Sequence, residues 1–158
     1  MATDQNQYLG NPLLKKANVS VEFTKEQIQE YQKCMGDPVH FIQEHMKIVS
    51  LDEGLVPFKM YDFQQNMVKT FHDNRFTICK LPRQSGKSTT IIAYLLHYVL
   101  FNENVNVAIL ANKSSTARDI LGRLQLGYEN LPKWLQQGVI SWNKGSLDLE
   151  NGSSILAA

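Results

Sequence analysis

The chain has 158 residues, which is long enough for one domain with its own hydrophobic core. Hydrophobic residues make up 43% and charged residues 20% of it, the balance of an ordinary soluble protein, and no run approaches the ~18 consecutive apolar residues of a membrane span. The formal net charge is only +1, so bulk charge gives no reason to expect a nucleic-acid partner, although a local basic patch would be averaged away.

The N-terminal part of the chain predicts an irregular arm and one helix. Residues 1–20 are polar and contain no apolar signal core, so we expect a poorly ordered arm. Thr24 and Gln27 have the spacing of a capping box, which opens a helix that continues to about Cys34. Gly36 is expected to stop that helix.

Two more helices are expected before the middle of the chain. Asp37 followed by Pro38 is the pattern of an N-cap and a first helical residue. Residues 48–60 include a glycine and a proline, and they predict a loop or a short extended piece. Residues 62–72 carry apolar side chains at helical spacing and predict the third helix.

From residue 76 onward the pattern alternates between strands and helices. The run 105–111 is almost wholly apolar, which is typical of a strand buried on both faces. Asn151-Gly152 between alternating runs is the strongest short signal for a hairpin. Two strand–helix–strand units predict an α/β fold with a mainly parallel sheet. The expected elements are strand 76–81, helix 87–101, strand 105–111, helix 115–128, the extended segment 139–142, and hairpin arms 147–150 and 153–156.

Cysteine and histidine usage gives no sign of a metal centre. Cys34 and Cys79 are far apart in the sequence and form no CxxC pair. Cys79 falls in the expected strand 76–81, where a small buried thiol is the simplest interpretation. The four histidines have no ligand spacing with each other or with cysteine, so no zinc site is expected.

The segment between strand 76–81 and helix 87–101 carries the clearest chemistry. A strand, a tight loop with Gly-Lys-Ser and a helix form the phosphate cradle of P-loop nucleotidases. Backbone N–H groups converge on the phosphates, and the positive end of the helix dipole points the same way. Lys87 would reach the β- and γ-phosphates, and the Ser88 hydroxyl would ligate Mg²⁺. The segment therefore predicts a nucleoside triphosphate site.

The match covers only the second half of the P-loop motif. The full motif has a glycine five positions before Gly86, where this chain has Leu81. An ordinary solvated lysine after a turn is the alternative, and the strand before the loop and the helix after it favour a phosphate loop. The loop is then entered differently, with Pro82 fixing one φ angle and Arg83 adjacent to the phosphates.

Arg83 and Gln84, directly before Ser85-Gly86-Lys87-Ser88, resemble the deviant Walker A motif of large terminases, the DNA-packaging motors of tailed bacteriophages. The likeness is closest to the T-even-type myovirus terminases and covers about residues 37–158. Three other segments carry it: an aromatic-Gln adenine motif at 61–64, the strand and loop after the Walker A helix at 109–115, and the hairpin before Walker B at 142–146 and 151–155.

The resemblance implies an incomplete P-loop NTPase sheet of the RecA or ASCE type. Residues 61–158 would form the N-terminal part of the ATPase domain, and residues 1–60 an arm with a small helical region before it. ATP and Mg²⁺ are the implied cofactors, and Arg83 and Lys87 the catalytic residues. The implied cofactor-binding residues are Phe63, Gln64, Arg83, Gln84, Ser85, Gly86, Lys87, Ser88 and Thr89, with Ser88 also on the metal.

Several of these roles have a simpler structural alternative. Gln64 would hydrogen-bond the adenine edge and Phe63 would stack on the base, but Phe63 also fits the apolar face of its helix and Gln64 could be solvated. Arg83 resembles an arginine finger acting in cis on the γ-phosphate, and it could equally pair a carboxylate and shape the loop.

Two further groups of side chains are open to a nucleic-acid interpretation. Lys113, Ser114 and Ser115 follow the second expected strand, where a lysine and hydroxyls suit contacts with a phosphate backbone. Capping of the next helix by one of the serines is favoured over that role. Trp134 and Trp142 could stack on bases, but buried aromatic residues are commoner.

The acidic motif that completes hydrolysis is missing from the sequence. No apolar run followed by Asp and Glu occurs after Lys87, so Walker B and the nuclease domain are expected to lie outside this chain. The chain is then the N-terminal part of a longer protein that binds nucleotide weakly and neither hydrolyses ATP nor cuts DNA alone. Its open sheet predicts marginal folding or self-association through unpaired edges.

The resemblance also implies partners and a location. Double-stranded DNA, the portal protein of the procapsid, the small terminase subunit and a homo-oligomeric ring are expected, and no membrane. The protein would be found in the host cytoplasm and transiently at the portal. A helicase-like DNA translocase and a truncated, non-catalytic nucleotide-binding protein are the alternatives.

Overall fold

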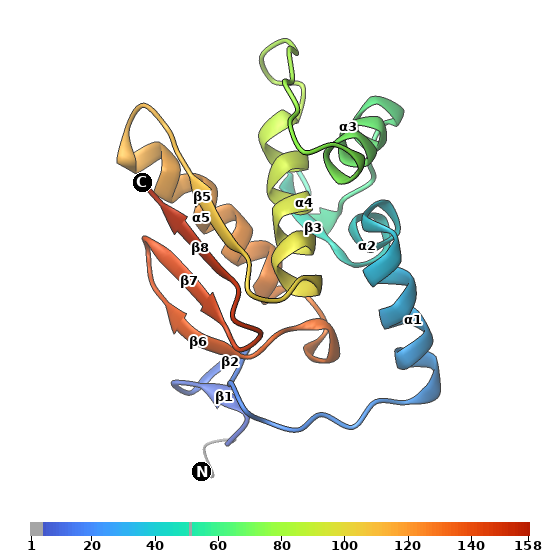
Figure 1. Ribbon diagram of the computed structural model, residues 1–158, viewed down its shortest axis with the longest axis vertical. Helices are drawn as coiled ribbons and strands as arrows, with labels where there is room; N and C mark the ends of the chain where they lie inside the picture. The colour runs from blue at the N-terminus through green and yellow to red at the C-terminus, as the bar shows by residue number, and fades with distance from the viewer. Residues whose placement is uncertain (1–4, 51) are drawn as a thin grey trace.

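A computed structural model describes residues 5–50 and 52–158, and two long helices form its centre (Figure 1). Helix α4 (Lys87–Phe101) packs along α5 (Ser114–Glu129), and α5 also covers one face of a four-stranded sheet. On the other side, α4 contacts α2 (Pro38–His45) and α3 (Asp62–Asp73). The order of layers is therefore sheet, α5, α4 and then the N-terminal helices, which makes this a mixed α and β structure.

The four-stranded sheet is mostly antiparallel, so the expectation of a mainly parallel sheet is wrong. Its strands are β5 (Asn106–Ile109), β6 (Val139–Trp142), β7 (Ser146–Leu149) and β8 (Ser154–Ala157), in the spatial order β5-β8-β7-β6. Only the β5–β8 pair is parallel. Short turns join β6 to β7 and β7 to β8, and such turns allow only antiparallel neighbours. The hairpin expected around Asn151-Gly152 is confirmed, with Gly152 at φ 80°.

The expected strand 76–81 is not formed. The segment has no regular secondary structure, and the side chains of Phe76 and Ile78 are 82% and 97% exposed. A strand needs a neighbour to satisfy its backbone groups, and no described strand pairs with this one. Cys79 is consequently half-buried and not a core thiol. The apolar composition of the segment indicated a strand, but composition alone does not supply the partner.

Strand β5 is an edge strand, so the expectation that it is buried on both faces is also wrong. It pairs only with β8 among the described strands, and α5 covers only one of its faces. Ile109 is buried, whereas Asn106 and Ala108 are exposed and the following Leu110 is 76% exposed. A nearly unbroken apolar run thus lies at the rim of the sheet.

The first two predicted helices are confirmed, together with their caps. Helix α1 (Lys25–Gly36) begins with a capping box, in which Gln27 N donates to the Thr24 hydroxyl at 3.2 Å and Thr24 N donates to Gln27 Oε1 at 3.0 Å. The Asp37 carboxylate caps α2 by accepting from the next two free backbone N–H groups, and Pro38 occupies its first turn.

The next stretch forms a short hairpin and the third predicted helix. Strands β3 (Lys47–Ser50) and β4 (Gly54–Pro57) pair antiparallel, which agrees with the short extended piece expected there. Helix α3 is confirmed, and its buried face consists of Gln64, Met67 and Val68. Within the described part of the chain, none of the helices has the length and apolar character needed to cross a bilayer.

The N-terminal segment is ordered, so the expectation of a disordered arm is wrong for residues 5–20; residues 1–4 lie outside the described residues. Strands β1 (Gln7–Tyr8) and β2 (Asn11–Lys15) form a hairpin, and Leu14 is only 2% exposed. Lys16 then forms a parallel bridge with Val139 at the start of β6. The partners are more than a hundred residues away in the sequence, which is why local composition gave no sign of them.

Glu150, in the turn after β7, fastens this N-terminal segment to the sheet. Its carboxylate accepts hydrogen bonds from Gly138 N at 2.7 Å and Asn18 N at 2.8 Å, and it pairs with Lys15 Nζ at 3.3 Å. Burial raises the pKa of the Glu150 carboxyl, but the hydrogen bonds from Gly138 and Asn18 and the Lys15 charge outweigh it and bring this pKa below its usual value. The folded state thus prefers the ionised carboxylate.

The core extends from the four-stranded sheet through α5 and α4 to α2. Tyr128 at the end of α5 is fully buried, and its hydroxyl donates to the carbonyl of Gln137. Trp142 packs on Tyr128 with ring centroids 5.3 Å apart, and Trp134, in the short 3₁₀ turn Lys133–Leu135, packs on His45 at 5.7 Å. Both tryptophans are half-buried against the core, as the structural interpretation favoured. The largest fully buried apolar side chains are Phe41, Leu14, Ile42, Leu96, Leu100, Leu121, Leu124, Leu135, Leu147, Leu149 and Ile155.

We expect Glu150→Gln to lower the free energy of unfolding by about 1–3 kcal/mol near neutral pH, because it removes the charge from three interactions. A carboxyl whose pKa is lowered on folding contributes its stability above its unfolded pKa of about 4.3 and loses it as the pH falls through the folded value. The difference between the wild type and the variant should therefore shrink below about pH 4. Urea denaturation at several pH values measures it.

Glu53→Gln is the matched control, because Glu53 is exposed in the β3–β4 hairpin. A Glu150→Gln variant as stable as this control near neutral pH would contradict the role given to Glu150. A stability difference that stays constant down to about pH 3 would contradict its pH dependence.

Candidate functional site

The loop before α4 has a backbone shape suited to anions. Gln84 and Gly86 have φ angles of 59° and 76°, both in the left-handed region, and Gly86 is the N-cap of α4. The first backbone N–H groups of a helix have no intrahelical acceptor, and no side chain among the described residues caps this end of α4. Successive backbone N–H groups in a left-handed turn form a concave anion site, and the dipole of α4 adds positive potential there. Helix α4 begins at Lys87, as the sequence predicts, although the strand expected before the loop is absent.

Lys87 lies folded over this loop. Its Nζ donates to the carbonyl of Pro82 at 2.8 Å and to that of Leu81 at 3.4 Å. The Ser85 hydroxyl donates to the same Pro82 carbonyl at 3.0 Å. The ammonium group is thus held at the mouth of the turn by neutral acceptors. A phosphate would be a stronger acceptor for it, because hydrogen bonds between two ionised groups are roughly twice as strong as neutral ones.

The fold brings Gln64 of α3 directly against the loop. Its side chain is only 4% exposed, so the solvated alternative is wrong. A Cβ atom placed on Gly86 would come within 2.5 Å of Gln64 Nε2, and the φ of 76° at this position also favours glycine. Gln64 Oε1 accepts a hydrogen bond from Tyr61 N at 2.9 Å, which fixes the amide at the start of α3. The start of α3 and the loop before α4 are therefore in contact, although the sequence relates them only through the family motifs.

Phe63 lies at the surface beside Gln64. It is 40% exposed and is not on the buried face of α3, so the interpretation of Phe63 as a core residue is not supported. Its ring stacks nearly parallel on that of Tyr61, with centroids 6.0 Å apart and 10° between the planes. Tyr61 is 71% exposed. The start of α3 therefore presents two stacked, solvent-exposed aromatic rings.

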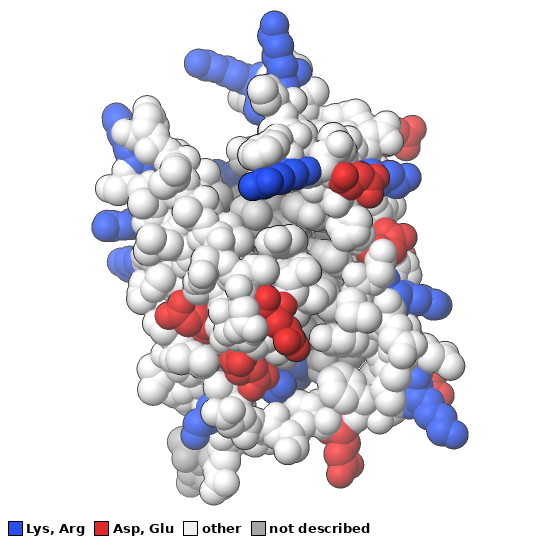
Figure 2. All heavy atoms as spheres, viewed as in Figure 1, with Lys and Arg blue, Asp and Glu red and all other residues white. Residues whose placement is uncertain are grey.

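The other predicted site residues lie on the loop and on the first turn of α4. Arg83, Gln84 and Ser88 are exposed, and Thr89 is half-buried. Among the described residues no carboxylate forms an ion pair with Arg83, so the alternative in which Arg83 pairs a carboxylate is not seen. Figure 2 shows Lys and Arg side chains, and no Asp or Glu, at the tip of the molecule where this loop projects in Figure 1.

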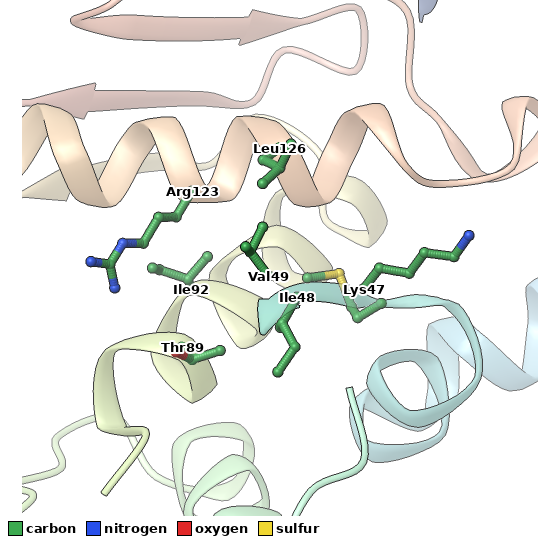
Figure 3. Close-up of a pocket in the computed structure, with 8 residues that line it drawn as sticks. Lys47, Ile48, Val49, Thr89, Ile92, Arg123 and Leu126 are labelled. Atoms are coloured by element: carbon green, nitrogen blue, oxygen red, sulfur yellow. The ribbon is translucent and has the colours of Figure 1, made fainter. Parts of the chain in front are cut away.

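A cavity of about 330 Å³ opens beside the first turn of α4, between β3 and α5 (Figure 3). Arg123 of α5 and Thr89 lie at one end of it, and Lys47 of β3 points to the other. Arg123 was not predicted as a site residue, because nothing in one sequence tells which face of α5 meets α4. The cavity is lined by Met46, Lys47, Ile48, Val49, Thr89, Ile92, Arg123 and Leu126.

The residues after β5 do not cap the next helix as expected. Helix α5 begins at Ser114 and its N-cap is Lys113, and within residues 5–50 and 52–158 no side chain supplies the cap hydrogen bond. The capping interpretation of Ser114 and Ser115 is therefore wrong. All three side chains are exposed, and their contact with a nucleic-acid backbone stays a prediction.

The second half of the chain matches a model of a known family. Residues 78–158 match the family described as terminase large subunit, T4likevirus-type, N-terminal, which is just over half of the chain. The matched stretch includes the loop, α4, α5 and the whole four-stranded sheet, whereas Phe63 and Gln64 lie before it. The chain therefore belongs to the family of T4-like-virus-type large terminase subunits, of which it carries N-terminal sequence.

Proposed function

We propose that this chain is the ATP-binding part of a viral DNA-packaging motor. Membership of the large terminase family suggests the packaging role. The observation that carries the nucleotide proposal is the loop itself, in which two left-handed residues turn the chain into the uncapped N-terminus of α4 and Lys87 Nζ lies over that turn. Anions bind at such helix ends because free N–H groups and the helix dipole act together.

In this proposal the loop holds the triphosphate. Lys87 exchanges the carbonyls of Leu81 and Pro82 for the β- and γ-phosphate oxygens. Backbone N–H groups from Ser85 to Thr89 bind the remaining oxygens, and the exposed Ser88 hydroxyl ligates Mg²⁺. The exposed Arg83 would act on hydrolysis, by stabilising charge on the transferring phosphoryl group.

The adenine base would lie near the start of α3. The stacked rings of Tyr61 and Phe63 offer it an aromatic face. The Gln64 amide is buried with its Oε1 bonded to Tyr61 N, and it would turn toward the edge of the base when the nucleotide binds. The contact between Gln64 and Gly86 supports this placement, because it brings the base-reading side chain next to the phosphate loop. Gln64 would then connect the bound nucleotide to α3, the helix that carries it.

The wider P-loop NTPase architecture is also part of the proposal. The free edge of β5 and the strand-like composition of 76–81 are compatible with a larger sheet that further strands would complete. No Asp-Glu pair follows an apolar run after Lys87, so ATP hydrolysis and DNA cleavage are proposed for a complete large subunit and not for this chain alone.

The partners follow from the same family. Double-stranded DNA, a portal protein, a small terminase subunit and further copies in a ring are proposed partners, and the host cytoplasm is the proposed location. The family match favours this function over that of a helicase-like translocase.

We expect Lys87→Ala to weaken binding of MgATP by roughly tenfold to a hundredfold. A hydrogen bond to a charged group contributes about 1.5–3 kcal/mol, and each 1.4 kcal/mol is a factor of ten in affinity. Isothermal titration calorimetry of the 158-residue chain measures the change. The matched control is Lys80→Ala, which removes an exposed lysine seven positions earlier and should leave the affinity unchanged. Equal affinities for the two variants would contradict the loop as the phosphate site.

We expect Gln64→Ala to weaken ATP binding about fivefold while GTP binding stays the same, because the amide reads the adenine edge and one hydrogen bond contributes about 1 kcal/mol. Competition between the two nucleotides measures this selectivity.

Gln65→Ala is the control for that change. Gln65 is the next residue on α3, and its Nε2 donates to the Met60 carbonyl at 3.4 Å, so it shares the helix but not the contact with the loop. If Gln64→Ala weakens the binding of ATP and GTP equally, or weakens the binding of neither, Gln64 does not read the adenine base and has a structural role only.

A further inference from the structure

A second group of chemically active side chains lies far from the loop, where α1 meets α2. Glu30 and Cys34 are one turn apart on α1, and His45 is the last residue of α2. The turn at Asp37 folds the two helices together, on the side of α4 opposite the sheet (Figure 1). One ligand atom of each of Glu30, Cys34 and His45 lies within 4.8 Å of the others.

Two of the three distances between these atoms approach those of a metal centre. Glu30 Oε1 lies 2.9 Å from His45 Nε2 and 3.6 Å from Cys34 Sγ. Zinc bonds of about 2.0–2.3 Å in a tetrahedral arrangement separate neighbouring ligand atoms by about 3.3–3.6 Å. Shifts of a few tenths of an ångström, with a closer approach of Cys34 to His45, would therefore make room for an ion among the three atoms.

The surroundings hold these side chains in place. Cys34 is fully buried, and its carbonyl accepts a hydrogen bond from His97 Nε2 at 2.8 Å. The ring of His45 packs edge-on against Trp134. His40 Nε2 lies 2.7 Å from the same Glu30 oxygen, which orients the carboxylate. Side-chain exposures of 15% for His45 and 26% for Glu30 leave one open side for an ion to enter.

We propose that Glu30, Cys34 and His45 bind a zinc ion that ties α1 to α2, with His40 positioning the Glu30 carboxylate. A thiolate, an imidazole and a carboxylate together select zinc over magnesium and calcium, which prefer oxygen ligands only. The ion replaces the Cys34 thiol proton, which leaves to solvent, and water completes the tetrahedron from the open side. The proposal reverses the expectation of no zinc, which rested on sequence spacing and could not include a ligand set shared between two helices.

The 158-residue chain, freed of metal with a chelator, is titrated with Zn²⁺ by calorimetry and with Co²⁺ by absorption. We expect one equivalent of Zn²⁺ to bind with a Kd below about 1 µM and to raise the melting temperature. Bound Co²⁺ should show a thiolate charge-transfer band and the visible spectrum of a tetrahedral ion. Absence of stoichiometric Zn²⁺ binding would overturn the proposal.

Two variants and two controls locate the site. Cys34→Ala should abolish the charge-transfer band, and His45→Gln should weaken Zn²⁺ binding at least tenfold. His45 is partly exposed, so its variant remains informative where Cys34→Ala fails to fold. Cys79→Ser and His72→Gln remove the same groups outside the cluster and should bind Zn²⁺ like the wild type. A charge-transfer band that persists in Cys34→Ala and disappears in Cys79→Ser would also overturn the proposal.

Discussion

Burial of α4 on almost every side is the constraint on which the rest of the structure depends. Its residues Ile92, Ala93, Leu96, Val99 and Leu100 are at most 4% exposed, because α5 covers one side and α2 and α3 cover the other. A helix packed in this way cannot rotate or slide without opening cavities in the core. The loop at its N-terminus and the contact with α3 are consequently fixed by the same packing.

How far the sequence predicted this fold depended on whether the decisive contacts were local. The caps of α1 and α2 and the turn at Asn151-Gly152 are set by residues within four positions of each other, and all of them were predicted correctly. The predictions of a strand at 76–81 and of a poorly ordered arm were wrong. A strand requires a partner, and Lys15 and Asn18 meet Glu150 only in the fold. Pattern alone supplies none of these distant neighbours.

The residues of the candidate site also separate into those predicted from local sequence and those brought together only by the fold. Gly86, Lys87 and Ser88 were predicted from a short motif, and the left-handed Gly86 at the start of a helix has a local cause. That Gln64 meets Gly86, and that Glu30 meets His45, follows only from how the helices pack. Arg123, beside Thr89, had no detectable signal in the sequence.

Hydrogen–deuterium exchange of the 158-residue chain with and without MgATP tests the central claim most directly. Binding at the loop orders backbone N–H groups that have no acceptor within α4, so exchange should slow in peptides covering 83–90 and 61–64. The exchange of peptides from β1 and β2 should not change. This hairpin lies at the start of β6, at the end of the molecule opposite the loop (Figure 1). Unchanged exchange across 83–90 at saturating MgATP, or slowing confined to other segments, would contradict the account.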